Sequence, residues 1–276
     1  FFFDNRLETT FMNDAKDDDS SITQVLGVPQ WLNHLPKGES LYACRQVMLE
    51  GETSHHAYSI QRVSSHPPIF LFKGILTGTE CHDIVREASH KTATPAQTGH
   101  NQGATARPHS SVVWLNNWDF LAESVAQSSV SLDDGAAWVE SMQVVTYTQE
   151  GEYVLHHDGN ERIATALYYL NGVGGTWFPL ADCNTAADSV PTNRQEALEM
   201  THSCIPGEDG LLIVGKEVPL VEENDHVIQV QAGDAVLFYN YLVGKDERAR
   251  SDWTTIHAGL PSPETKQYLP IFCSGF

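Results

Sequence analysis

The order of apolar and polar residues predicts a helical region followed by a long run of strands. The apolar run 69–72 predicts a strand directly after His66-Pro67-Pro68. A helix is predicted from Glu80 to about His90 and capped by Thr79, because one set of apolar residues recurs at helical spacing: Cys81, Ile84, Val85 and Ala88.

The second part of the chain predicts mainly strands. Residues 110–115 predict another strand, and Asp119 is placed to cap a second helix that reaches about Ser128. From Met142 onward, short apolar runs are separated by Gly, Pro and Asn. This order favours an α+β, mainly β fold: a double-stranded β-helix, or jelly roll, with supporting helices packed on one sheet.

The pattern also divides the chain into regions. Residues 1–66 predict an acidic N-terminal leader, disordered over about its first 22 residues and without a clean apolar period in the rest. Residues 67–276 predict the main domain. Residues 181–222 predict a surface insertion, whose apolar stretch Leu211–Val214 is long enough for an added strand.

Charge and composition exclude some functions. The chain has 276 residues, 41% of them apolar, and a formal charge of −20. Such an acidic chain lacks the clustered Lys and Arg that nucleic acids require, and it favours basic peptides instead. No run of about twenty apolar residues predicts a membrane span. The chain starts with Phe1-Phe2-Phe3 rather than Met, which leaves open that a targeting segment has been removed.

The five cysteines leave the redox compartment open. They form no C-x-x-C pair, which argues against a structural zinc site. Cys183 and Cys204 flank the predicted insertion, and they are equally compatible with a disulfide in an oxidising compartment and with two reduced thiols.

The sequence His156-His157-Asp158 carries candidate metal chemistry. In a strand, residues i and i+2 point to the same side, so His156 and Asp158 share a face while His157 points away. A third ligand must then come from another strand, and the β-branched run 252–257, which ends at His257, predicts one. Two imidazoles and one carboxylate on one face of an ion leave the opposite positions open, as in non-haem Fe(II) oxygenases.

An ordered series of flanking segments strengthens this interpretation. The segments are Glu140–Tyr147, Gly151–Tyr153, Arg162–Asn171, Gly174–Pro179, Ala232–Phe238 and Thr255–Gly259, with Lys266 nine residues after His257. Over about residues 67–276, this series resembles the catalytic domain of the prolyl 4-hydroxylases, which are 2-oxoglutarate- and Fe(II)-dependent dioxygenases.

The resemblance implies a role for each matching residue. His156, Asp158 and His257 match the iron ligands, and Lys266 matches the residue that pairs with the far carboxylate of 2-oxoglutarate. Tyr147 and Thr176 match hydroxyl-bearing positions of the same pocket, while Arg162 and Tyr153 match positions that face the peptide. The resemblance further implies O₂ as a substrate, ascorbate as a cofactor and residence in the endoplasmic reticulum or secretory pathway.

Structural roles compete with these assignments. Lys266 would otherwise be a solvated lysine in a loop, Tyr147 and Thr176 ordinary core residues, and Arg162 half of a surface ion pair with Glu161.

The preferred hypothesis is a procollagen-proline 4-hydroxylase-like enzyme that hydroxylates peptidyl proline at C4. Its partner would be a proline-containing peptide or protein, and the sequence does not indicate a partner subunit. Two alternatives stay open: the same enzyme class acting on another amino-acid side chain or a small molecule, and a non-catalytic jelly-roll binding module.

Overall fold

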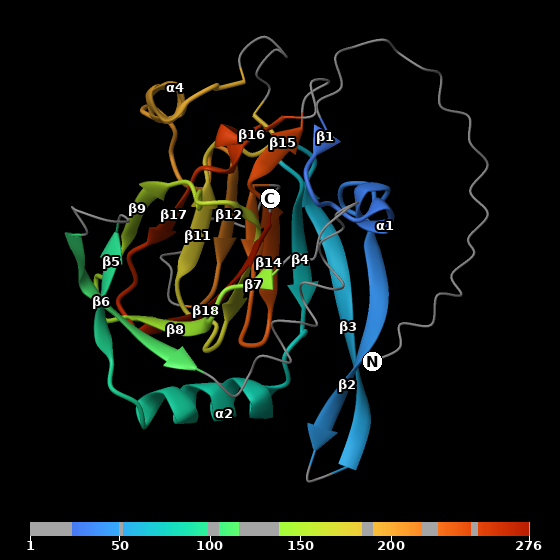
Figure 1. Ribbon diagram of the computed structural model, residues 1–276, viewed down its shortest axis with the longest axis vertical. Helices are drawn as coiled ribbons and strands as arrows, with labels where there is room; N and C mark the ends of the chain where they lie inside the picture. The colour runs from blue at the N-terminus through green and yellow to red at the C-terminus, as the bar shows by residue number, and fades with distance from the viewer. Residues whose placement is uncertain are drawn as a thin grey trace.

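The computed structural model describes residues 24–49, 52–98, 105–115, 138–183, 190–216, 226–243 and 248–275. The predicted disorder of the first 22 residues and the predicted helix at 119–128 lie outside these ranges. Within them, strands dominate, with two facing sheets and few helices (Figure 1). Among the described helices, none has the length and apolar character needed to cross a membrane.

The larger sheet has ten strands and carries one side of the candidate site. In spatial order, its strands are β2 (Ser40–Leu49), β3 (Glu52–Ser64), β4 (Ile69–Lys73), β14 (Ala235–Tyr239), β10 (Arg162–Tyr169), β18 (Lys266–Ser274), β8 (Met142–Tyr147), β6 (Thr105–Leu115) and β5 (Thr94–Thr98), with β7 (Trp138–Val139) also paired to β18. All these pairs are antiparallel, and β10 and β18 are central.

The smaller sheet has five strands and carries the other side of the site. Its order is β13 (Val227–Gln229), β12 (Leu211–Val214), β11 (Gly175–Phe178), β17 (His257–Leu260) and β9 (Tyr153–His156). A third sheet consists of β1 (Gln24–Val25), β15 (Tyr241–Val243) and β16 (Ala249–Ser251). The helical elements are α1 (Gln30–Asn33), α2 (Gly78–Ser89), α4 (Arg194–Met200) and the 3-10 turn η2 (Trp253–Thr255).

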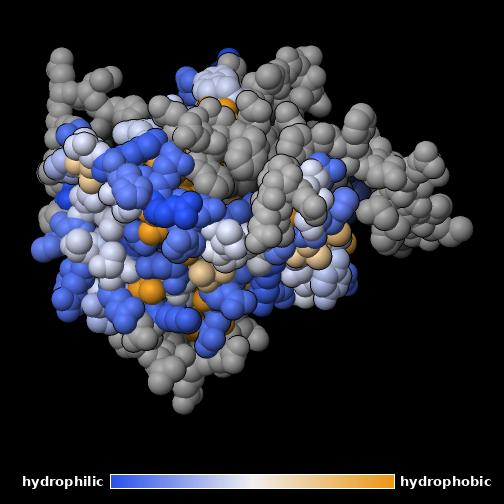
Figure 2. Space-filling view, turned by 90° about the horizontal axis from the view of Figure 1, so that it is seen from below, coloured by the Kyte–Doolittle hydropathy of each residue, from blue (hydrophilic) through white to orange (hydrophobic). Residues whose placement is uncertain are grey.

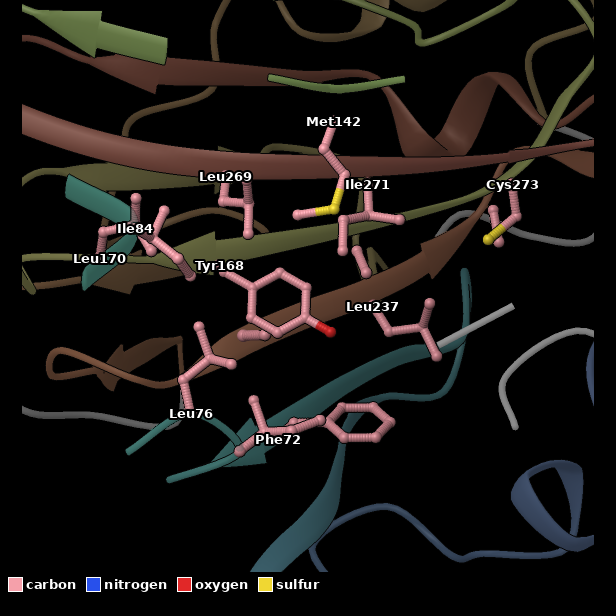
Figure 3. Packing of buried hydrophobic residues seen from close by; sticks show 14 of the residues in the cluster. Phe72, Leu76, Ile84, Met142, Tyr168, Leu170, Leu237, Leu269, Ile271 and Cys273 are labelled. Carbon is pink, nitrogen blue, oxygen red and sulfur yellow. The ribbon is translucent and has the colours of Figure 1, made fainter. Parts of the chain in front are cut away.

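Strand β14 shows how the layers are built, because all five of its residues are buried. Leu237 faces one core together with Tyr168, Ile271 and Ile84 of α2 (Figure 3). Val236 and Phe238 face a second core with Phe178 and Ile213 of the smaller sheet. A strand covered on both faces needs a continuous apolar run, and β14 has one. The larger sheet therefore lies between α2 and the smaller sheet.

This arrangement is the predicted double-stranded β-helix with a supporting helix on one sheet. The prediction of α2 was right in its apolar face but wrong in its cap. Thr77, not Thr79, accepts a hydrogen bond from the Glu80 amide, and the Glu80 carboxylate accepts one from the Thr77 amide in return. This reciprocal capping box fixes the start of the helix two residues earlier than predicted.

The segment before His257 also differs from the prediction. Residues 252–257 do not form a strand, because η2 occupies 253–255 and β17 begins only at His257. The Asp252 carboxylate accepts hydrogen bonds from the amide and hydroxyl of Thr254. A side chain that bonds to its own backbone in this way competes with strand pairing.

Two regions predicted to lie outside the main β core contribute strands to it. The described part of the leader includes β2 and β3, and β3 pairs with β4 across the predicted boundary at residue 66. In the predicted insertion, α4 was not foreseen, while Leu211–Val214 forms the predicted strand β12. All four residues of β12 are buried between β11 and β13, so this part of the insertion belongs to the core rather than to the surface.

Candidate metal centre and active-site cavity

His156, Asp158 and His257 come together at one end of the smaller sheet. His156 ends β9 and His257 begins β17, and these two residues are directly paired across the antiparallel strands. Each of the three offers one ligand atom, and these atoms lie within 4.8 Å of one another. The Asp158 carboxylate lies 3.5 Å from His156 Nε2 and 3.9 Å from His257 Nε2, which leaves room for an ion between them.

Hydrogen bonds orient both imidazoles toward this point. Nδ1 lies 2.9 Å from the Val154 carbonyl in His156 and 3.0 Å from the Thr255 carbonyl in His257. A carbonyl only accepts hydrogen bonds, so Nδ1 carries the proton and the Nε2 lone pair is free. This is how metal-binding histidines are held in proteins.

Protonation favours ligand binding as well. Burial, together with the neighbouring His156, lowers the pKa of His257 to about 4. Burial alone would raise the pKa of Asp158, but the His257 and His156 imidazoles hold it below its usual value. At neutral pH His257 and Asp158 thus present the unprotonated atoms that a metal ion requires.

The group is set in an apolar wall. The His257 ring lies 4.9 Å from the Phe238 ring and 5.3 Å from the Phe178 ring, and the two phenylalanines are in edge contact. Phe178 belongs to the smaller sheet and Phe238 to the larger one. The packing between the sheets therefore fixes the position of this histidine.

A cavity of about 1020 Å³ opens beside the three residues. His156, Asp158 and His257 line it, as do four other residues selected from the sequence: Tyr147, Tyr153, Arg162 and Thr176. The open side of the candidate metal group therefore faces a space large enough for a cosubstrate and part of a larger molecule.

Lys266 lies behind the lining of this cavity and is not one of its lining residues. Its side chain is fully buried, and its ammonium donates to the Leu260 carbonyl and lies 4.7 Å from the centre of the Tyr147 ring. Burial lowers its pKa to about 8. The solvated-lysine alternative is therefore wrong, although the role of Lys266 toward 2-oxoglutarate stays a prediction.

The two hydroxyl-bearing residues are held by hydrogen bonds. The Tyr147 hydroxyl accepts from Nη1 of Arg107 over 2.8 Å, and burial raises its pKa to about 12. The Thr176 hydroxyl accepts from Tyr169 over 2.8 Å, which joins the two sheets beside the cavity. Both hydroxyls keep their own proton available for a ligand.

The two predicted substrate-facing residues are both engaged. Arg162 pairs with both carboxylate oxygens of Glu140, at 2.6 and 2.7 Å, and lies over the Phe272 ring. The predicted alternative, an ion pair of Arg162 with Glu161, is therefore wrong, because Glu140 is the partner. The Tyr153 ring stacks on His156 with ring centres 3.6 Å apart. His157 is turned away from the group, with Nε2 3.1 Å from the Asn240 carbonyl.

Two residues of the site were missed in the sequence. Thr165 is buried on β10, and its hydroxyl donates to Asp158 over 2.8 Å. Arg107 lies on β6, which begins five residues before the predicted strand. Pro108 and the polar residues around it conceal that strand, and β10 is buried at most of its positions, so no alternation marks Thr165.

Sequence comparison with curated proteins points to one family. "Probable prolyl 4-hydroxylase 4" of Arabidopsis thaliana is 25% identical over 83% of this chain and 77% of its own length. "Prolyl 4-hydroxylase 2" of the same plant is 23% identical over 76% of this chain and 67% of its own length. In sequence, the chain is similar to prolyl 4-hydroxylases. No family model matches it.

Solved prolyl hydroxylases also align with the chain. A viral collagen prolyl hydroxylase from Paramecium Bursaria Chlorella virus-1, in complex with 2OG, covers 75% of this chain and 96% of its own, with a TM-score of 0.46 and 17% identity. A Pseudomonas putida prolyl-4-hydroxylase covers 75% and 92%, with a TM-score of 0.45 and 16% identity.

Proposed function

We propose that this protein is an Fe(II)- and 2-oxoglutarate-dependent dioxygenase that hydroxylates peptidyl proline at C4. The observation that carries the proposal is the convergence of His156, Asp158 and His257 on one point at the wall of a large cavity. The sequence relationship to prolyl 4-hydroxylases supports the reaction class.

The residues present fit an iron ion. Two imidazoles and one carboxylate form the facial set typical of non-haem Fe(II) oxygenases. The hydrogen bonds to Val154, Thr255 and Thr165 hold each ligand in place before any ion binds. With iron bound, the site would convert 2-oxoglutarate, O₂ and a C–H bond to succinate, CO₂ and C–OH, with ascorbate as the reductant that keeps the iron ferrous.

The surrounding residues would bind 2-oxoglutarate by its far carboxylate. Lys266 supplies an ammonium in a buried setting, and Tyr147 and Thr176 supply hydroxyl protons nearby. A charge-assisted hydrogen bond in such a setting is stronger than a neutral one. The Lys266 ammonium carries three donor protons, and the Leu260 carbonyl accepts from one of them, so others remain for the carboxylate.

The remaining cavity would hold the peptide. Tyr153, Pro270 and Phe272 give its wall an apolar and aromatic character, which suits a proline ring. Arg162, held by Glu140 over Phe272, would donate to a peptide carbonyl from a fixed position.

The decisive experiment measures succinate release from 2-oxoglutarate with Fe(II), O₂ and ascorbate, with and without a poly-proline peptide. Peptide-stimulated succinate and a 16-dalton gain on proline are expected. Succinate without stimulation would keep the oxygenase and reject the substrate, leaving another side chain or a small molecule. Absence of any succinate with every component supplied would contradict the enzyme and favour a binding module.

A further inference from the structure

The charged residues of the cavity contrast with the rest of the chain. The formal charge of the whole chain is −20, yet the charged lining residues that the structure describes are Arg107, Arg162, Arg194 and a single acid, Asp158. Asp158 belongs to the candidate metal group. An ion bound there would add further positive charge, so the cavity as a whole is suited to anions.

Of the two lining arginines closest to the candidate metal group in the described contacts, Arg162 has a carboxylate partner and Arg107 has none. Glu140 neutralises Arg162, whereas in the described part of the chain Arg107 donates its side-chain hydrogen bond to the neutral hydroxyl of Tyr147. Its Nε is buried and has no hydrogen-bond partner among the residues that the structure describes. Buried donors are normally satisfied, so a buried Nε–H without a partner indicates a group that completes the site.

Arg107, with its unpaired Nε–H, lies close to the candidate metal group. The Arg107 guanidinium lies over the Tyr153 ring, 4.1 Å from the ring centre. The same Tyr153 ring stacks on the imidazole of His156. One aromatic ring therefore separates the guanidinium from a candidate metal ligand. A group bound to Arg107 would therefore lie in the same cavity as the candidate metal group, one aromatic ring away from His156.

We propose that Arg107 binds a carboxylate of the substrate, so that the enzyme prefers a substrate with an anionic group beside the oxidised carbon. Nη1 is held by Tyr147, which leaves the edge formed by Nε and Nη2, and this edge matches the two oxygens of a carboxylate. The inference rests on the proposed function for the identity of the reaction. It reverses the preference for basic peptides that the overall charge predicts.

Two sources could supply the carboxylate: an acidic side chain next to the target proline, or a free C-terminus. The probes are therefore short proline peptides with Glu or Gln beside the proline, each made with a free and with an amidated C-terminus. Binding is measured by calorimetry on the full chain loaded with Zn(II) and 2-oxoglutarate, and turnover is measured separately with Fe(II).

In the wild type, we expect roughly tenfold tighter binding of the carboxylate-bearing member of one probe pair, as a charge-assisted hydrogen bond provides. A preference for Glu in amidated peptides identifies the side chain, and a preference for the free terminus identifies the C-terminal source. Arg107→Gln should abolish the discrimination, and Arg107→Lys, which keeps the charge but loses the fork, should retain part of it.

Controls separate this role from others. Arg86→Gln removes an arginine from the surface of α2, where Arg86 pairs with Asp83, and should leave discrimination unchanged. Tyr147→Phe removes the partner of Nη1 and should raise the 2-oxoglutarate requirement while discrimination persists. Equal binding of all probes by the wild type, or full discrimination in Arg107→Gln, would overturn the inference. A rise in the 2-oxoglutarate requirement of Arg107→Gln with no loss of discrimination would instead assign Arg107 to the cosubstrate.

The calorimetric arm does not depend on turnover, so it distinguishes the two proposals. Discrimination without succinate formation would support the anion site and contradict the dioxygenase. Succinate formation without discrimination would do the reverse.

Discussion

His156 and His257 face each other as paired residues of adjacent antiparallel strands, with ring centres 4.2 Å apart. The two imidazoles are 101 positions apart in the sequence, and strand pairing brings them together. Asp158 follows two residues after the end of β9 and joins them.

Replacing Asp158 by Ala should abolish turnover and weaken metal binding by at least roughly 10- to 100-fold, which is what loss of a supporting hydrogen bond alone costs in such sites. Metal binding is measured by calorimetry on the metal-free protein. The neighbouring substitution His157→Gln serves as the control and should retain the metal, because His157 is turned toward Asn240. Wild-type metal affinity in Asp158→Ala would reject the ligand assignment.

Replacing Thr165 by Val should lower metal affinity by roughly 10- to 100-fold, because the hydrogen bond that orients Asp158 is lost while the volume is kept. Thr165→Ser keeps the hydroxyl and should restore most of the affinity. The Val variant should also lose roughly 1–3 kcal/mol of unfolding free energy, since buried polar groups lose a partner. Equal metal affinities of the Val and Ser variants would show that this hydrogen bond does not support the site.

The pKa of Lys266 predicts how 2-oxoglutarate binding depends on pH. Burial lowers this pKa to about 8, so the ammonium of the free enzyme loses its proton as the pH rises through 8. The apparent affinity for 2-oxoglutarate should therefore fall above pH 8, which initial rates at varied cosubstrate concentration would show. Lys266→Arg should remove this dependence because arginine stays charged.

Lys266→Ala should raise the 2-oxoglutarate requirement at every pH. An unchanged requirement in this variant would place the cosubstrate elsewhere in the cavity.

Gly174 should not tolerate a side chain. A Cβ at this position would lie 2.6 Å from Lys266 Cδ and collide with the Tyr268 hydroxyl, and its φ of +91° also favours glycine. Gly38 has a similar φ of +84° but open space around it, so Gly38→Ala measures the backbone cost alone. Gly174→Ala should cost roughly 1–3 kcal/mol more than Gly38→Ala in urea unfolding, as overpacking does. Equal costs would contradict the close packing around Lys266.

Regular patterns in the sequence predicted much of this fold. The apolar run of β4, the apolar face of α2 and the spacing of His156 and Asp158 all follow from local patterns. Where a polar side chain bonds to nearby backbone, the same reasoning fails: Asp252 turns a β-branched segment into η2, and Thr77 starts α2 early. These competing hydrogen bonds are short-range, but they leave no mark on the apolar period.

Other features depend on tertiary contacts that no local pattern carries. Strand β3 is long, but near its start polar residues occupy both the exposed and the partly exposed positions. The strand therefore shows no clean apolar alternation. Arg107 reaches the cavity because β6 pairs with β8 and brings it beside Tyr147. Seen from below, the coloured residues of the surface are mostly hydrophilic, and hydrophobic ones form small separate spots (Figure 2). Localisation in the secretory pathway stays a prediction.

The contact between Phe178 and Phe238 has a consequence for cosubstrate choice. Iron would be held by residues of one sheet and its adjoining loop, whereas Lys266 and Tyr147 belong to the other sheet. The two aromatic rings lie between the sheets beside His257 and set their separation at this point. Under the proposed function, the thickness of the sandwich would fix the distance between the iron and the far carboxylate of 2-oxoglutarate, and it would favour a dicarboxylate of that span over one a methylene shorter or longer.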